Sequence, residues 1–142
     1  MNCRERRGPG WHDDRVPHVE KIIPILNVRD VEASLKYYVE VLGFDHPWHW
    51  GHPATFGGVG ADGSEIHFCL NGQGNPGTWL AIWVDDVNAV YERLRSRPVD
   101  IRQPPTTFPW GVRELNIADP DGHRIRFSTA TDAPPDDREF PG

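Results

Sequence analysis

Apolar and polar residues alternate along the stretch 108–127, FPWGVRELNIADPDGHRIRF, on both sides of the turn residues at 119–122. Strict alternation predicts a β-hairpin with one apolar face and one polar face. The polar face carries two arginines and a glutamate, with Trp110 beside it, and we interpret it as the wall of a pocket. A face that is simply wetted by solvent, as in many antiparallel sheets, is the alternative.

The same pattern occurs twice in the chain. DGSEIHF at residues 62–68 returns as DGHRIRF at 121–127, a shift of 121 − 62 = 59 residues. VRDVEA at 28–33 returns as VDDVNA at 84–89, a shift of 84 − 28 = 56 residues. Repetition at a long period indicates a duplicated supersecondary unit. The sequence predicts two tandem βαβββ modules, an α+β fold with a cupped mixed sheet and the helices on its outer side.

In the first module, expected at residues 21–70, a nearly continuous apolar run from 21 to 28 predicts a strand that Pro24 confines to an edge or a crossing point. Asp30 occupies a helix N-cap position, and Gly43 ends the helix. The apolar stripe of this helix is Val31, Leu35, Tyr38 and Leu42. Residues 44–70 read as three short strands with turns near 51–53 and 62–63.

The second module, expected at residues 78–129, repeats this plan. A strand at 79–84 precedes a helix that Asp86 caps and that ends before Pro98. The helix stripe is Val87, Tyr91 and Leu94. A short strand near 99–102 and a proline-rich loop at 103–110 then lead into the hairpin.

The two ends of the chain lack any such periodicity. Residues 1–20 and 130–142 are rich in Pro, Gly and charged side chains, and we expect a flexible arm and a flexible tail around one domain at 21–129. Two cysteines, Cys3 and Cys69, make neither a disulfide framework nor a metal site, so both are expected to be free thiols.

Composition narrows the classes of partner. The net charge of −6, with no basic patch, argues against nucleic acid. The chain has no apolar run of membrane-spanning length and no leader pattern, so we expect a cytoplasmic protein without a membrane contact.

Strand periodicity also predicts which side chains line the cup. Residues Leu26, Val28, Ile66, Phe68, Ile82, Val84, Ile125 and Phe127 should pack under the helices. The opposite face, here named the cleft face, then carries Ile23, Ile25, Asn27, Glu65, His67, Trp79, Ala81, Trp83, Glu114, Asn116, Arg124, Arg126 and Ser128. An aromatic cleft with a few charges suits a large, flat, partly polar ligand. The predicted ligand-binding residues are Trp48, Trp50, Glu65, His67, Trp79, Trp83, Trp110, Glu114 and Arg126. Core or interface packing is the alternative role for each Trp, and ordinary hydrogen bonding, for example to Glu65, is the alternative for His67.

Three stretches in this order resemble the vicinal-oxygen-chelate superfamily, which includes glyoxalases, bleomycin-resistance proteins and dioxygenases: PILNVRDVEAS, WLAIWVDDVNAVY and PWGVRELNIADPDGHRIRF. The chain is most similar to the bleomycin-resistance group. That resemblance implies a homodimer that holds an antibiotic in clefts between subunits and exchanges an N-terminal strand hinged near Pro24.

The superfamily's enzymes hold a divalent metal at four strand positions, which correspond here to Ile23, His67, Trp79 and Arg126. Only the histidine among them offers a donor that a divalent metal accepts. We therefore expect no metal, no cofactor and no catalytic residue. A second histidine group, His46, His49 and His52, is poorly spaced for a metal site on a strand, and two prolines break any helix there.

The resemblance, together with the aromatic cleft face, implies a small protein that sequesters an aromatic natural product, for example a glycopeptide antibiotic, in a dimer cleft. The acidic composition suits a cationic drug, whereas Arg124 and Arg126 on the cleft face suit a neutral or anionic one. Two alternatives remain open. One is a glyoxalase-like lyase or isomerase, or a dioxygenase, with displaced metal ligands; the other is a non-catalytic dimeric interaction module.

Overall fold

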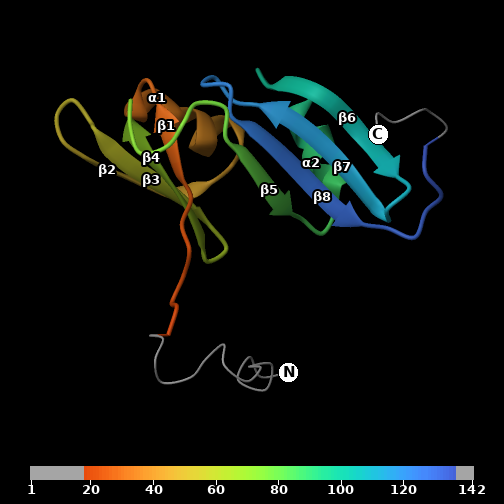
Figure 1. Ribbon diagram of the computed structural model, residues 1–142. Helices are drawn as coiled ribbons and strands as arrows, with labels where there is room; N and C mark the ends of the chain where they lie inside the picture. Colours follow the sequence, from red (N-terminus) through yellow and green to blue (C-terminus); the bar gives the residue numbers. More distant parts are fainter. Residues whose placement is uncertain (1–17, 137–142) are drawn as a thin grey trace.

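The computed structural model describes residues 18–136, which form two βαβββ modules side by side (Figure 1). The predicted arm at 1–17 and the end of the tail at 137–142 lie outside the described residues. The elements of module one are β1 (Ile25–Val28), α1 (Val31–Lys36), its π-helical continuation η2 (Tyr37–Val41), β2 (Asp45–Trp50), β3 (Phe56–Ala61) and β4 (Ser64–Leu70). Those of module two are β5 (Trp79–Trp83), α2 (Val87–Leu94), β6 (Asp100–Phe108), β7 (Val112–Ala118) and β8 (Arg124–Ala130).

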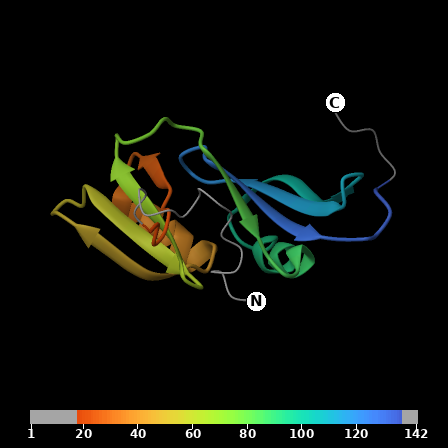
Figure 2. The same ribbon diagram turned by 60° about the horizontal axis from the view of Figure 1, so that its bottom comes forward.

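Each module builds one four-stranded mixed sheet, in the order β1-β4-β3-β2 and β5-β8-β7-β6. The first strand of each module pairs in parallel with the last, and the other pairs are antiparallel. Each helix packs on one face of its own sheet (Figure 2). The α+β class and the duplicated βαβββ plan are confirmed, with the mixed sheet divided into one half per module.

The two modules share one strand register. Ile25 lies opposite His67 in module one, and Ala81 lies opposite Arg126 in module two. These pairs are related by the two sequence shifts, since 25 + 56 = 81 and 67 + 59 = 126. The repeat read from the sequence is therefore a repeat of three-dimensional positions.

Both helices begin at the residues that the sequence predicts. The Asp30 carboxylate accepts a hydrogen bond from the Ala33 N–H, and Asp86 accepts from Asn88 and Ala89, which satisfies N–H groups that a helix start leaves without partners. The predicted stripe of the first helix is buried along its whole length, from Val31 to Leu42. Gly43 then ends it with a φ of +89°, in a place where a Cβ would collide with the Arg93 guanidinium.

The prediction of a proline-rich loop at 103–110 is wrong. Residues 100–108 form one nine-residue strand, β6, which contains both Pro104 and Pro105. β6 is the edge strand of its sheet, and its pairing with β7 shifts register on either side of Gln103. An edge position with bulges tolerates residues that cannot donate to the ladder, so the strand continues through the prolines.

The hydrophobic core lies between the sheets and their helices, as predicted. Leu26, Val28, Ile66, Phe68, Ile125 and Phe127 are all buried, and Ile82 and Val84 are partly buried against the same cluster. Leu115 and Ile117 complete the cluster from the hairpin. Burial of these side chains on one face is what leaves the other face of each sheet available to a ligand.

A buried histidine joins the two modules. His123 is fully buried, its Nδ1 accepts a hydrogen bond from the Thr78 N–H at 3.0 Å, and its Nε2 contacts the Asn27 carbonyl oxygen at 2.7 Å. Because the Asn27 oxygen can only accept, Nε2 carries the proton and donates it to that bond. His123 therefore fastens the module-two hairpin to strand β1 of module one.

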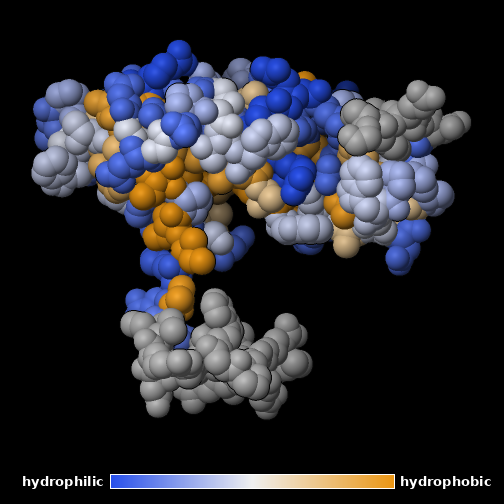
Figure 3. Space-filling view, in the orientation of Figure 1, coloured by the Kyte–Doolittle hydropathy of each residue, from blue (hydrophilic) through white to orange (hydrophobic). Residues whose placement is uncertain are grey.

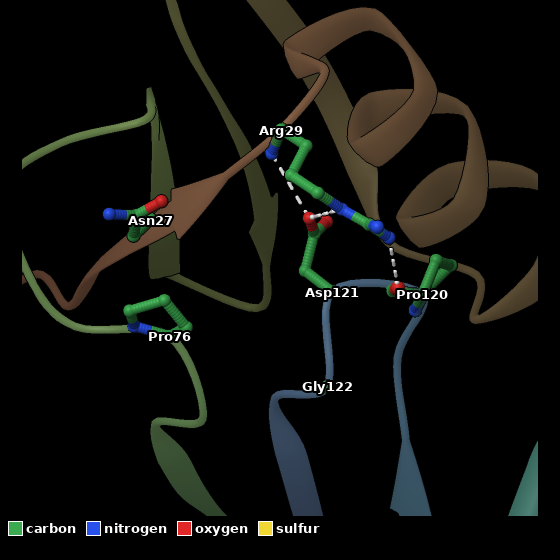
Figure 4. A pocket seen from close by; sticks show the side chains of 6 residues that line it. All are labelled: Asn27, Arg29, Pro76, Pro120, Asp121 and Gly122. Carbon is green, nitrogen blue, oxygen red and sulfur yellow. Dashed lines mark hydrogen bonds and ion pairs between the residues drawn. The ribbon is translucent and has the colours of Figure 1, made fainter.

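Polar contacts around Asp119 reinforce this junction. Asp119 accepts from the Tyr38 hydroxyl at 2.7 Å and from the main-chain N–H groups of Asp121 and His123, both at 2.9 Å. Arg29 donates from its main chain and its Nε to the Asp121 carboxylate, both at 3.0 Å (Figure 4). A pocket of about 350 Å³ lies beside Arg29. The Arg29 guanidinium already donates hydrogen bonds to Asp121 and Pro120 of the hairpin.

The described ends of the chain differ in their contacts. Residues 18–24 leave the body as an extended segment, on which Ile22 is 88% exposed (Figure 1). At the other end Ala130 belongs to β8, and Asp136 exchanges two hydrogen bonds with Thr107, each of 2.9 Å. The limits of the domain stay a prediction. The helices in the described part of the chain are too short and too polar to span a membrane.

Candidate functional site

The cleft face of module one is centred on His67. Trp48 on β2 and His67 on β4 both face Gly58 on β3, and their rings meet edge to face with centroids 5.0 Å apart. A Cβ on Gly58 would lie 2.8 Å from the Trp48 Nε1 and 2.9 Å from the His67 ring. The Phe56 ring lies 5.5 Å from the imidazole and 5.7 Å from the Trp48 ring, so the three rings contact one another. The absent side chain at Gly58 thus allows the indole and the imidazole to lie on the sheet.

Glu65 stands beside this aromatic group and is held by two partners. Lys21, from the extended N-terminal segment, forms an ion pair with one carboxylate oxygen, and His67 Nε2 lies 3.4 Å from the other. Lys21, and to a smaller extent His67, hold the pKa of Glu65 below its ordinary value. The hydrogen bond between His67 and Glu65 that the alternative describes is present, and a role of His67 in ligand binding stays a prediction. An open groove of about 560 Å³ runs beside Trp48, Lys21 and Glu65.

The cleft face of module two is an ordered array of three rows. Trp79, Ala81 and Trp83 follow one another along the edge strand β5, and all three are exposed. Arg124, Arg126 and Ser128 lie opposite them on β8, and Asn116 and Glu114 lie opposite Arg126 and Ser128 on β7. Two indoles therefore flank a small residue, with guanidinium groups along one side.

The two arginines of this array have different partners. Arg124 donates from Nε to the Asn116 side chain at 3.0 Å, and its guanidinium lies over the Trp79 ring at 4.6 Å. Arg126 lies 3.9 Å from the Glu114 carboxylate, too far for a hydrogen bond. Among the described residues its buried Nε has no hydrogen-bond partner. Arg124 is thus fixed in place, whereas Arg126 retains donor capacity.

The remaining predicted aromatic residues lie at the margins. Trp50 is 72% exposed at the end of β2, where its pairing with Phe56 places it on the cleft face. Trp110 lies in the turn between β6 and β7 and stacks on Phe108, with ring centroids 4.7 Å apart and an interplanar angle of 15°. Phe108 is opposite Val112, on the same side of the sheet as Glu114. Trp110 therefore stands at the far end of the module-two array.

The four positions that correspond to metal ligands do not fit a divalent metal. Ile23 lies in the extended segment before β1, and Trp79 and Arg126 belong to the array of module two. His67, the one suitable donor of the four, is enclosed by Trp48, Phe56 and Glu65. In residues 18–136, moreover, no group of three or more His, Cys, Asp or Glu side chains is placed to hold a metal ion.

The second histidine group does not provide a ligand set either. His46 sits at a bulge in β2 with a φ of +51° and pairs with Asp45 at 2.7 Å, which raises the pKa of His46. His49 instead lies against the His52 ring, with centroids 5.7 Å apart. The bulge at His46 is a local feature that the strand periodicity of the sequence does not show.

The structure adds residues that the sequence reasoning did not select. Gly58 and Phe56 shape the surroundings of His67, while Ala81 forms the floor between the two indoles of β5. The sequence analysis places both Ala81 and Arg124 on the cleft face but not among the binding residues. A signal for Ala81 and Arg124 was available, because the sequence shifts equate Ala81 with Ile25 and Arg124 with Glu65. No comparable signal existed for Gly58.

Comparison with known proteins places this arrangement in a family. The sequence model of the Glyoxalase/Bleomycin resistance protein/Dioxygenase superfamily matches residues 15–127. The search of curated proteins found no match.

Solved structures show the same fold. TnmS3, described as an antibiotic binding protein from Streptomyces sp. CB03234, is 27% identical, with a TM-score of 0.67 over 84% of this chain and 100% of its own. A superfamily member from Sphaerobacter thermophilus is 25% identical, with a TM-score of 0.65 over 81% and 98%. TioX from Micromonospora sp. ML1 is 21% identical, with a TM-score of 0.70 over 79% and 99%. The chain therefore belongs to the glyoxalase/bleomycin resistance protein/dioxygenase superfamily.

Proposed function

We propose that this protein binds and sequesters a planar aromatic natural product, of the kind used as an antibiotic, without a metal and in the cytoplasm. The observation that carries this proposal is the exposure of four indoles on the cleft face. Trp48 is 38% exposed, Trp50 is 72% exposed, Trp79 is 56% exposed and Trp83 is 62% exposed. Large aromatic side chains left in water on one face of a folded protein mark a binding surface.

The similarity to TnmS3 supports the same class of ligand, since that protein is described as antibiotic binding. The groups that the described residues place on the cleft face are suited to recognition. On the cleft face His67 contacts a carboxylate that Lys21 already holds, and Arg124 is fixed by Asn116. Stacking together with a few fixed charges is suited to holding a flat molecule and orienting it.

We further propose that two copies of the chain form the cleft. On the cleft face of each module, the polar side chains contact residues of the same module only. Each module therefore presents half of a binding site, and this half is open to a second half. Hydrophobic surface runs along the extended N-terminal segment and onto the neighbouring face of the body (Figure 3). The exposed side chains on and beside that segment are Val19, Ile22 and Ile25. A second copy that covered this surface would bring two half-sites together.

Ligand binding is tested by titrating the protein with a panel of planar aromatic antibiotics that includes bleomycin. We expect at least one compound to quench tryptophan fluorescence and to raise the melting temperature by mass action. Trp83→Ala should weaken binding of that compound about thirtyfold, since an anchoring aromatic typically contributes about 2 kcal/mol. Glu92→Ala, on the exposed side of α2, is the control and should leave the affinity within about twofold. A panel without any quenching or thermal shift would refute the proposal.

Association is tested by sedimentation velocity at micromolar concentration. We expect a dimer, and Ile22→Asp should shift it towards monomer because it places a charge in the covered apolar surface. Lys36→Asp, on the exposed outer side of α1, introduces the same side chain elsewhere and should leave the dimer intact. A wild-type protein that sediments as a monomer, with and without a bound compound, contradicts the two-copy cleft.

A further inference from the structure

The charges over the module-two array are unlike those of the whole chain. On the cleft face of β5, β7 and β8 the charged residues are Arg124, Arg126 and Glu114, a balance of 2 − 1 = +1. The chain as a whole carries −6. A local cationic surface inside an acidic protein favours an anionic group on the molecule that occupies it.

We propose that the ligand is an acidic aromatic: a flat ring system with a carboxylate or an ionised phenol that binds Arg126, between Trp79 and Trp83 and over Ala81. This inference rests on the proposed function and specifies the class of ligand for the same site. It replaces a cationic drug, which the net charge of the chain alone favours, with an anionic one.

The shape of the array carries the first part of the argument. Trp79 and Trp83 are four residues apart on one strand, which separates their Cα atoms by about 13 Å. Ala81 between them leaves a gap above the strand, and Arg126 lies directly beside it on β8. A ring system of two or three fused rings matches this gap, with an indole at each end.

The hydrogen bonding of Arg126 carries the second part. Within the described residues its buried Nε has no hydrogen-bond partner, and the side chain as a whole is 43% exposed, so a ligand contacts the exposed end of the side chain rather than Nε. The planar guanidinium binds a carboxylate through two parallel bonds, which supplies both charge and orientation. Glu114 at 3.9 Å orients Arg126 without using these donors.

The neighbouring arginine is not equivalent. Arg124 is committed to Asn116 and to the face of Trp79, so one side of that indole is already covered. A ligand ring therefore stacks on Trp83 or on the free side of Trp79, and its acidic group lies at the middle of the array, next to Arg126. The site is selective for the position of the acid as well as for its charge.

The test uses three probes with one ring system: naphthalene-2-carboxylate, naphthalene-2-carboxamide and naphthalen-2-ylmethylammonium. Isothermal titration calorimetry on the full-length protein should give the highest affinity for the carboxylate, a lower one for the carboxamide and the lowest for the ammonium compound. Arg126→Gln should lower the affinity for the carboxylate by about tenfold or more, because it removes a charge-assisted pair. The affinity for the carboxamide should stay within about twofold. Ala81→Leu should weaken both probes alike, because it fills the floor of the gap.

Arg95→Gln is the matched control. It removes the same charge from the exposed end of α2, where Arg95 pairs with Glu92, and should leave all three affinities unchanged. A preference for the ammonium probe, or a carboxylate affinity that Arg126→Gln does not reduce, overturns the acidic-ligand inference and leaves aromatic binding intact. If none of the probes and no antibiotic in the panel binds the wild-type protein, the proposed function fails and the inference fails with it.

Discussion

Replacing His123 by alanine is expected to lower the free energy of unfolding by about 3–5 kcal/mol, a large part of the stability of a domain of this size. The imidazole is fully buried and satisfies two main-chain groups on different segments, the Thr78 N–H and the Asn27 carbonyl oxygen. Its removal leaves both groups buried without a hydrogen-bond partner, which lowers the stability by about 1–3 kcal/mol for each group, and it also leaves a cavity.

Urea denaturation at one fixed protein concentration measures this change, since association of two copies would add to the apparent stability. His49→Ala removes the same side chain from an exposed site on β2 and should change the free energy of unfolding by less than about 0.5 kcal/mol. Equal stabilities for the two variants would show that the contacts of His123 do not hold the modules together.

Alkaline pH is expected to destabilise the protein from pH 10 upwards, and the part of the loss that Tyr37 causes falls between pH 10 and about 12. Burial, followed by the charges of Asp119 and Asp100, raises the pKa of Tyr37 from 10.0 to about 12. Burial, with Asp119 next, also raises the pKa of Tyr38 well above 10.0. Above pH 10 the unfolded chain loses these protons first, so the native state binds more protons and its stability falls as the pH rises. Tyr37 alone accounts for about 2–3 kcal/mol across this interval.

The measurement is denaturation at a series of pH values, with tyrosinate absorbance to follow ionisation. Tyr38→Phe removes the hydroxyl that donates to Asp119, so it lowers stability at neutral pH yet flattens the alkaline part of the curve. Tyr37→Phe should flatten it without the loss at neutral pH, because within the described residues the Tyr37 hydroxyl has no hydrogen-bond partner. A wild-type curve that stays level to pH 12 would contradict the burial of both phenols as the cause.

Most of the fold could be predicted because its signals are local. Asp30 and Asp86 each precede an apolar stripe, and the structure shows both carboxylates bonded to helix N–H groups. β6 could not be predicted, because Pro104 and Pro105 are compatible with a strand only at a sheet edge. Edge position is set by the order of all four strands, which the sequence of one strand does not contain.

For the candidate site, the sequence could predict on which face of the sheet each residue lies. Strand periodicity placed His67, Trp79 and Arg126 opposite the core, and burial alternates as expected over residues 124–127 of β8, although Ser128 is also buried. It could not identify His123, whose neighbours in the sequence suggest an ordinary turn residue. Its two partners lie 45 and 96 residues away. A contact of this kind depends on how the modules meet, and local pattern carries no information on that.

Because the two modules share one register, equivalent positions in the two copies of the repeated unit can be compared directly. Positions under the helices have kept their character in both copies: Leu26 and Ile82, Val28 and Val84, Ile66 and Ile125, Phe68 and Phe127. Equivalent positions on the cleft face differ in every case: Ile25 and Ala81, Asn27 and Trp83, Glu65 and Arg124, His67 and Arg126. After duplication, packing constrained one side of the sheet while the other side diverged. A molecule held between the two kinds of half-site meets different chemistry at its two ends, so a symmetric scaffold can still bind it in a single direction.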